Sequence, residues 1–377
     1  MVSCFFLMKK FDLTKEEARR IGWEMSELRI QTYMERTQTK NFEIHSIRFL
    51  SLESVADLQK LLKINRETLH HLVNFPSYQE FSIPKKKGGV RKICAPAPYL
   101  KKAQKTLNYY LQAVYLVRKP ECSHGFVIKP KSSLDTFNIV TNAAPHCGKK
   151  FVMNIDLENF FPSISAKRVR DLLAGPQFEF QGDIPDILAL LCTYKRALPP
   201  GAPASPVISN FICMEMDNEL MDFCTEKNTT YTRYADDLTF SSDVYVDDAI
   251  ISEIRNIITK HRFVVNEKKF RVQSKNRKQT VTGLLVNKKP NVDRRYIRKL
   301  RATLHHLKEE GLDKAVSKHL NLQREITEKD RIYFIRKVAG SINFVEMVRG
   351  KSDPVFLKLN WAFHINLSEY VSATTQY

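Results

Sequence analysis

The chain has 377 residues, of which 43% are apolar and 23 are phenylalanine, and this composition excludes a disordered protein. Lysine and arginine number 60 against 41 aspartates and glutamates, so the formal net charge is +19. Such an excess is unusual for an enzyme of small metabolites and indicates a polyanionic partner, nucleic acid before a membrane surface. A basic protein whose charges are merely solvated is the alternative that charge alone leaves open.

The seven cysteines are scattered and form no Cys-x-x-Cys pair, which argues against a zinc knuckle or a disulfide framework and fits a reducing cytoplasm. The apolar stretch at residues 4–8 is too short for a signal sequence, and its positive charges follow it. No segment approaches the roughly 18 apolar residues of a membrane span. We therefore expect a cytoplasmic protein with no membrane partner.

The predicted elements begin with helices over residues 12–75, with a capped helix start at Thr14 and an amphipathic stretch at 54–63. Residues 80–95 are predicted as a β-hairpin with a basic Gly-Gly tip, and residues 100–118 are helical again. The remaining elements follow in this order: a strand at 151–155 ending at Asp156, helix over most of 166–195, a rigid loop at 199–206, an apolar helix at 207–224, two short strands within 231–242, a helix at 247–261, further strands, and a basic helical region from 293 to about 348. This order predicts an α+β centre with helical flanks.

Two adjacent carboxylates, Asp236 and Asp237, fall in the turn between the two short strands, within Tyr234-Ala235-Asp236-Asp237. Like charges in a turn repel each other unless a cation balances them, and a divalent metal is the usual solution. The alternative is an exposed acidic turn.

A third carboxylate, Asp156, ends an earlier apolar strand and is followed by two phenylalanines. If both strands lie in one sheet, the carboxylates converge, as phosphoryl transfer with two metal ions about 4 Å apart requires. Hard oxygen ligands suit Mg²⁺. The alternative for Asp156 is an ordinary strand end beside core aromatic residues.

These motifs, in this order, resemble those of reverse transcriptases: Asp156 with Phe160-Phe161, the loop at 200–206, and Tyr234-Ala235-Asp236-Asp237. The resemblance runs from about residue 80 to about residue 350 and implies a right-hand polymerase with fingers, a palm of antiparallel sheet plus helices, and a helical thumb. The implied boundaries are 1–75 for an N-terminal helical region, 76–150 for fingers with an insertion, 151–290 for the palm with a fingers segment at about 166–198, and 291–377 for the thumb and tail.

The resemblance also implies site residues. Asp156, Asp236, Asp237 and the backbone carbonyl of Leu157 would hold two Mg²⁺ ions, for which Mn²⁺ can substitute. The residues implied to bind the incoming dNTP are Lys87, Arg91, Phe161, Gly201, Ala202 and Lys269. Phe161 would exclude a 2′-hydroxyl, Arg91 would clamp phosphate, and Lys269 would protonate the leaving pyrophosphate.

Two structural alternatives and one departure from the family pattern accompany these roles. Phe161 could be a core residue, and the three lysines at 85–87 could form a solvated turn. Pro200 stands where the family usually has Gln, so one side-chain contact to nucleotide or template is missing or supplied elsewhere.

Two further strings resemble retron reverse transcriptases: Asn142-Ala143-Ala144-Pro145-His146 and Val281-Thr282-Gly283. This implies a cognate structured noncoding RNA, primed from the 2′-hydroxyl of an internal guanosine and copied into a branched RNA–DNA hybrid (msDNA). The implied RNA contacts are Asn142, His146, Thr282, Gly283, Arg295 and Arg298. Equally, Asn142 could cap a helix, His146 could be structural, Thr282-Gly283 could be a turn, and the arginines could lie on a solvated face.

The same resemblance implies an antiphage defence system in which the enzyme and its product restrain a separate toxic effector protein. Only about thirty residues follow the predicted thumb, too few for a further domain, so a host ribonuclease H is expected to degrade the template. The alternatives are a reverse transcriptase of another lineage, a catalytically silent RNA-binding module, and an ordinary basic α+β enzyme.

Overall fold

The structure is a computed structural model that describes residues 13–37, 39–85, 88–128 and 136–367. The apolar stretch at 4–8 and Lys87 lie outside the described residues. The chain divides into two compact units, Met1–Asn142 with Met153–Val272, and Ala143–Val152 with Gln273–Tyr377. The finer division into fingers, palm and thumb stays a prediction.

The first unit opens with short helices, as predicted for residues 12–75. Thr14 caps the first of them, since its side chain accepts the Glu17 N–H while the Glu17 carboxylate accepts the Thr14 N–H. The helical elements are α2 (Lys15–Arg19), a π-helical turn (Arg20–Glu24), α3 (Glu27–Thr37), α4 (Asn41–Leu50), α5 (Val55–Leu62) and α6 (Arg66–Asn74).

The predicted hairpin is confirmed. β1 (Tyr78–Pro84) pairs antiparallel with β2 (Val90–Pro96), with Tyr78 opposite Pro96. Gly88 and Gly89 in its tip have φ angles of 90° and 79°, which side-chain-bearing residues rarely adopt. The long helix α7 (Pro98–Arg118) follows and packs against α4 and α11.

A four-stranded sheet forms the centre of the fold, in the order β4 (Thr230–Tyr234), β5 (Asp237–Ser242), β3 (Phe151–Asp156) and β6 (Arg271–Ser274). β4 and β5 form an antiparallel hairpin. β5 and β3 lie inside the sheet, and both are buried along nearly their whole length. This burial explains the apolar run of β3 and the apolar Leu238 and Phe240 of β5.

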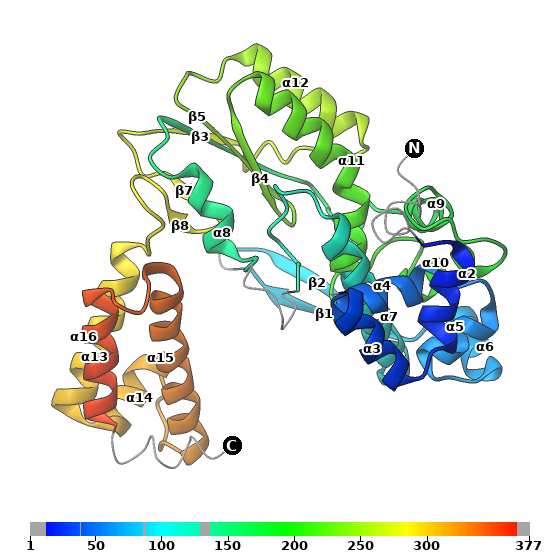
Figure 1. The fold of residues 1–377 in the computed structure, drawn as a ribbon. Helices are drawn as coiled ribbons and strands as arrows, with labels where there is room; N and C mark the ends of the chain where they lie inside the picture. Colours follow the sequence, from blue (N-terminus) through cyan, green and yellow to red (C-terminus); the bar gives the residue numbers. More distant parts are fainter. Residues whose placement is uncertain (1–12, 38, 86–87, 129–135, 368–377) are drawn as a thin grey trace. The chain divides into compact units, whose positions relative to one another are not determined.

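The first unit also contains α9 (Ala166–Ala174), α10 (Ile184–Cys192), α11 (Ser205–Glu226) and α12 (Asp248–Lys260). α11 packs against β4, α7, α9 and α12, so it joins the sheet to the helices that precede it in the chain (Figure 1).

The described residues of the second unit form a short 3-10 helix (Ala144–His146), a small hairpin and a group of α-helices. Its elements are β7 (Thr280–Val281), β8 (Leu284–Leu285), α13 (Arg294–Glu310), α14 (Leu312–Leu320), α15 (Glu328–Arg349) and α16 (Pro354–Asn366). Their core includes Leu304, Phe334 and Phe363. The helical region was expected to end near residue 348, so α16 is an addition to the prediction.

The combination of antiparallel strands and helices confirms the α+β fold class. Among the described residues, no helix has both the length and the apolar character needed to cross a bilayer.

Candidate active site

Three carboxylates meet where β3 and the β4–β5 hairpin lie side by side. Asp156 is the last residue of β3, Asp236 lies in the hairpin turn, and Asp237 is the first residue of β5. The Leu157 N–H donates to the Asp236 carbonyl at 3.0 Å, which fixes the end of β3 against the turn. The strand order therefore brings together residues that are far apart in sequence.

The electrostatics of this site favour a bound cation. Burial raises the pKa of Asp236, and the neighbouring charge of Asp156 adds to the shift. The side chain of Asp237 is exposed, but the surrounding protein displaces part of its water. This desolvation raises the pKa of Asp237 to about 6, and the charges of Asp236 and Asp156 add to the shift. Lys269 and Arg91 oppose the shift at Asp236. A cation placed here would relieve repulsion among the carboxylates.

Lys269 contacts Asp156 directly. Its Nζ lies 2.7 Å from both carboxylate oxygens of Asp156. Asn266 contacts the same residue twice, because its Nδ2 donates to Asp156 Oδ2 at 3.3 Å and its N–H donates to the Asp156 carbonyl at 2.8 Å. The string Asn266-Glu267-Lys268-Lys269 is thus placed at the carboxylate cluster.

The donor set fits a divalent cation, since carboxylate and carbonyl oxygens are the ligands that Mg²⁺ and similar ions prefer. In the part of the chain that the structure describes, no three His, Cys, Asp or Glu side chains are already arranged to hold a metal ion. A metal ion that bound both carboxylate oxygens of Asp156 would have to displace Lys269 from them.

A buried ion pair lies beneath the hairpin turn. The side chains of Arg233 in β4 and Asp217 in α11 are both fully buried. Arg233 Nε lies 2.8 Å from Asp217 Oδ1, and its Nη2 lies 2.6 Å from Asp217 Oδ2. The Tyr231 hydroxyl also donates to Asp217, at 2.9 Å. These additional hydrogen bonds offset part of the cost of burying two charges.

This ion pair also holds the turn itself. Arg233 Nη1 donates to the Ala235 carbonyl at 3.1 Å and to Asn210 Oδ1 at 3.0 Å. Ala235 has a φ of 59°, which is unfavourable for a residue with a side chain. Sequence reasoning missed Arg233, Asp217 and Asn210. The available signal was an arginine inside a buried strand, but its partner could not be identified from sequence.

Gly125 packs directly on the backbone of the turn. A Cβ at this position would lie 2.5 Å from the Ala235 nitrogen, so only glycine fits. The neighbouring His124 N–H donates to the Arg233 carbonyl at 3.0 Å, and Asn210 Nδ2 donates to the Gly125 carbonyl at 2.9 Å. This segment was also missed, because it belongs to no regular element.

The predicted nucleotide-binding residues lie in the same unit. Arg91 is exposed on β2, and its charge acts on Asp236. Phe161 is half-buried beside Phe160, with ring centroids 5.3 Å apart. Ala202 is buried, with 3% of its surface exposed.

Gly201 has a φ of 109°, and a Cβ there would lie 2.7 Å from Ile93 Cγ2. The Pro200 carbonyl accepts the Cys94 N–H at 2.8 Å. The loop at 200–206 is therefore fixed to the β1–β2 hairpin through its backbone. This contact does not depend on the side chain at position 200.

The predicted RNA contacts lie in different environments. Asn142 and His146 are fully buried. Among the described residues, neither side-chain polar atom of Asn142 has a hydrogen-bond partner. Thr282 and Gly283, with φ angles of 44° and 87°, form the two-residue turn between β7 and β8. Direct RNA contact by Asn142 or His146 would require their exposure.

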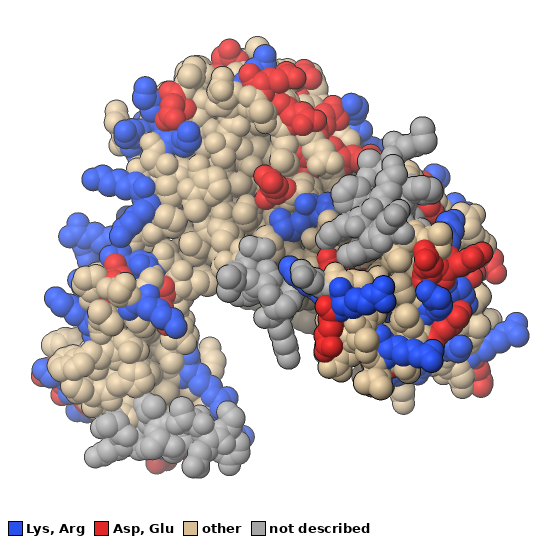
Figure 2. Space-filling view, in the orientation of Figure 1, with Lys and Arg blue, Asp and Glu red and all other residues tan. Residues whose placement is uncertain are grey.

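Arg295 and Arg298 are exposed on α13, where Arg294, Lys299 and Arg301 are exposed as well. Figure 2 shows further lysine and arginine side chains over the segment that carries β7 and β8. These basic surfaces are consistent with phosphate contacts, and equally with solvated faces.

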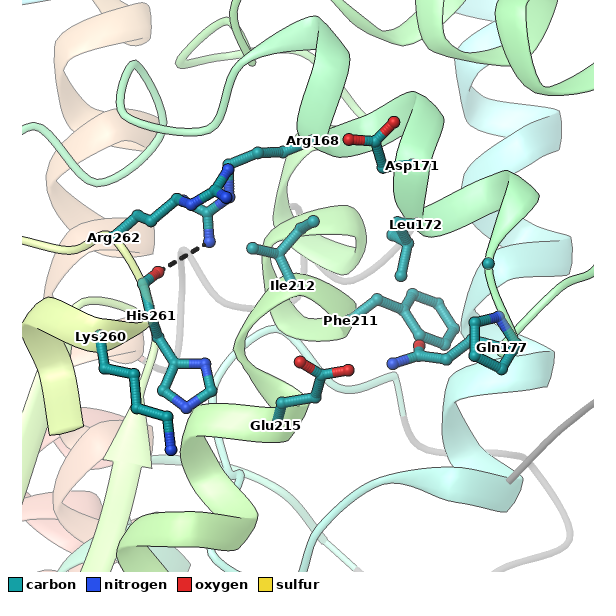
Figure 3. Close-up of a pocket in the computed structure, with 12 residues that line it drawn as sticks. Arg168, Asp171, Leu172, Gln177, Phe211, Ile212, Glu215, Lys260, His261 and Arg262 are labelled. Carbon is teal, nitrogen blue, oxygen red and sulfur yellow. Dashed lines mark hydrogen bonds between the residues drawn. The ribbon is translucent and has the colours of Figure 1, made fainter. Parts of the chain in front are cut away.

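A pocket of about 460 Å³ lies away from the carboxylates, between α9, α11 and residues 260–262. Arg168 Nη2 donates to the His261 carbonyl at 3.0 Å in its wall. Figure 3 shows side chains of both signs around it, including Arg262 and Glu215. It contains none of the predicted site residues.

Comparison with known proteins identifies the family. Residues 83–286 match the family model "Reverse transcriptase (RNA-dependent DNA polymerase)". The chain is 31% identical over 277 residues to the retron Ec86 reverse transcriptase of Escherichia coli, an alignment that covers 71% of this chain and 82% of that protein. It is 35% identical to the retron Mx65 reverse transcriptase of Myxococcus xanthus, covering 64% of this chain and 57% of that protein.

Among solved structures, telomerase from Candida albicans in complex with a fragment of telomeric RNA aligns with 80% of this chain and 65% of its own at 12% identity, with a TM-score of 0.42. The family match and the retron relatives suffice: this chain belongs to the retron reverse transcriptases, which are RNA-directed DNA polymerases.

Proposed function

We propose that this protein copies a cognate structured noncoding RNA into DNA from the 2′-hydroxyl of an internal guanosine, so that its product is a branched RNA–DNA hybrid (msDNA). The observation that supports this most directly is the similarity to named retron reverse transcriptases across most of the chain. The carboxylates at the β3 and β4–β5 junction supply the chemistry that such synthesis needs.

In this proposal Asp156, Asp236 and the Leu157 carbonyl hold two Mg²⁺ ions, with Asp237 in support and Mn²⁺ able to substitute. The ions would activate the attacking hydroxyl and neutralise charge on the leaving pyrophosphate. Lys269, which already contacts Asp156, would give a proton to the pyrophosphate.

The remaining roles concern the incoming dNTP. Arg91 and Lys87 bind its triphosphate, because a guanidinium and an ammonium both pair with phosphate oxygens. Gly201 and Ala202 shape the pocket through their backbone. The Phe161 ring occupies the space of a 2′-hydroxyl and so selects deoxyribonucleotides.

Recognition of RNA is assigned to both units. Arg295 and Arg298 on the exposed face of α13 contact phosphates, and Thr282 with Gly283 presents a tight turn to the RNA. Asn142 and His146 are also proposed to serve RNA recognition, although their burial means that they would act after a local rearrangement or through the fold.

The cellular setting is part of the proposal. The enzyme and its product would act in the cytoplasm within an antiphage system and restrain a separate toxic effector protein. A host ribonuclease H would remove the copied template RNA.

The test is to purify the protein from its native locus and to analyse the nucleic acid that co-purifies, before and after treatment with ribonuclease and with debranching enzyme. A short discrete DNA joined to RNA by a 2′–5′ linkage is expected, and the Asp236→Asn variant should lack the DNA. Nucleic acid of random length, or none, would reject the retron product and would leave a reverse transcriptase of another lineage.

A further inference from the structure

Residues 122–128, called here the 122–128 segment, connect the catalytic hairpin to Phe161. At one end Cys122 accepts the Arg233 N–H at 2.8 Å, and Gly125 lies against the Ala235 backbone. At the other end the Phe126 ring centroid lies 6.0 Å from that of Phe161, with the planes inclined by 35°. One short segment therefore touches both the carboxylate-bearing turn and the aromatic side chain proposed to select the sugar.

The backbone at Phe126 is held in an unfavourable conformation. Its φ is 60°, in the left-handed region that bulky side chains rarely adopt. Such a conformation persists only when surrounding contacts enforce it. In this conformation of the backbone the Phe126 ring lies against Phe161. A backbone with a negative φ at Phe126 would point the ring in a different direction.

Buried amides enforce that conformation. Gln112 in α7 has 4% of its surface exposed; its Nε2 donates to the Phe126 carbonyl at 2.7 Å, and its Oε1 accepts the Ile128 N–H at 3.2 Å. Asn210, fully buried in α11, donates to the Gly125 carbonyl at 2.9 Å. The segment is thus anchored by two long helices on either side of the Phe126 ring.

We propose that Phe126 is a positioning residue for sugar selection: its ring limits the movement of Phe161 and so keeps Phe161 in the space of a ribonucleotide 2′-hydroxyl. The proposal rests on the proposed role of Phe161. Phe161 contacts Phe160 and Phe126, and Phe160 in turn stacks on Phe263 at 5.8 Å. Loss of the Phe126 ring removes one of the aromatic contacts of Phe161, which also packs on Phe160 and the hydrophobic core, and Phe161 gains room to move away from the sugar.

The experiment compares incorporation of a dNTP and of the matching rNTP on an RNA template with an annealed DNA primer, as kcat/KM for each. Phe126→Leu should lower the ratio of the two values by about three- to tenfold, the range expected for loss of one aromatic pair, through faster rNTP incorporation. Phe126→Tyr should keep the native ratio. The matched control is Phe263→Leu, which removes a ring from the same cluster and should leave the ratio unchanged.

Three further variants make the result decisive. Phe161→Val should lower the ratio at least as much as Phe126→Leu, and the double variant should lower it no further than Phe161→Val alone, because Phe126 acts through Phe161. Gln112→Ala keeps the Phe126 ring but removes its anchor, and should shift the ratio in the same direction even if Phe126→Leu fails to fold.

The outcomes separate the two proposals. Equal losses for dNTP and rNTP in Phe126→Leu, or an unchanged ratio in both it and Gln112→Ala, would overturn the role of Phe126. An unchanged ratio in Phe161→Val would overturn the sugar-selecting role of Phe161 and, with it, this inference. Neither result bears on branched-product synthesis, which the co-purified nucleic acid reports.

Discussion

Lys269 Nζ lies 2.7 Å from each carboxylate oxygen of Asp156, so an ammonium and a divalent metal would compete for the same oxygens. The Lys269 side chain is 60% exposed, and its pairing with Asp156 is therefore worth only about 1 kcal/mol. The pairing is loose enough to be replaced by a metal ion.

This competition predicts that Lys269→Met binds Mn²⁺ about fivefold more tightly in calorimetry without nucleotide, while its rate of DNA synthesis falls because the proposed proton donor is gone. The matched control is Lys268→Met, which removes the same charge from the adjacent exposed residue. Weaker metal binding in Lys269→Met would show that the ammonium helps to assemble the site instead of competing for it.

The buried pair of Arg233 and Asp217 should dominate the stability of the hairpin. Arg233→Met leaves the Asp217 carboxylate buried without its cation, and we expect the free energy of unfolding to fall by about 3–5 kcal/mol. The double variant Arg233→Met with Asp217→Leu should recover part of this loss.

Urea denaturation provides the measurement for this pair. The exposed pair of Lys260 and Glu219 serves as its control, and Lys260→Met should cost less than about 1 kcal/mol. If Arg233→Met costs no more than Lys260→Met, the buried pair does not support the turn.

Gly125→Ala tests how closely the turn must be placed. The added Cβ would lie 2.5 Å from the Ala235 nitrogen, so the turn that carries Asp236 must shift. A misplacement of about 1 Å can reduce a rate about a hundredfold, and we expect a loss of that order in primer extension.

Gly340→Ala is the matched control, because within the described part of the chain nothing beyond its chain neighbours and the nearby backbone of α15 lies within 4 Å of a Cβ at this position. This variant should extend primers normally and gain up to about 1 kcal/mol of stability. Normal synthesis by Gly125→Ala would mean that the turn tolerates displacement.

The helices and strands around these residues could be predicted from the sequence where a local pattern of residues identifies them. The β1–β2 hairpin follows from its basic Gly-Gly tip, β3 follows from its apolar run, and β5 follows from the strand-favouring residues Leu238-Thr239-Phe240. Their adjacency within the sheet was not predictable, since the order β4-β5-β3-β6 depends on pairing between distant segments.

The candidate site likewise contains residues that the sequence identifies and residues that it does not. Asp156, Asp236 and Asp237 were identifiable because each stands at a strand end in a recognisable string. Asp217 and Arg233 were not, since Asp217 is one of five acidic residues in α11 and the sequence does not reveal which of them pairs with Arg233.

The helix α16 was missed for a different reason. Leu357, Trp361 and Ile365 are exposed on it while Phe356, Leu359 and Phe363 are buried, so apolar residues surround the helix and no single face stands out.

Stability should depend on pH through His124. Burial lowers its pKa to about 4 from the ordinary 6.5, with the charge of Lys119 adding to the shift. Between these values the unfolded chain binds a proton that the folded chain does not. The contribution of His124 to the free energy of unfolding is therefore fully present above about pH 6.5. It is lost as the pH falls toward 4, and the loss reaches up to about 3 kcal/mol.

Urea denaturation at about pH 7 and about pH 5 measures this effect. His124→Gln should lose less stability between the two conditions than the native chain does. His305→Gln, at an exposed position on α13, is the control and should follow the native chain. An unchanged pH dependence in His124→Gln would place the titrating group elsewhere.

We propose that the carboxylates of Asp156, Asp236 and Asp237 carry metal-dependent DNA synthesis. The most direct test is primer extension on an RNA template by Asp236→Asn, beside Asp222→Asn at an exposed position of α11. We predict that Asp236→Asn loses about a thousandfold or more in rate, as expected for several kcal/mol of metal stabilisation, while it binds RNA as the native chain does and Asp222→Asn is unaffected. Retained synthesis by Asp236→Asn would contradict the assignment of the active site.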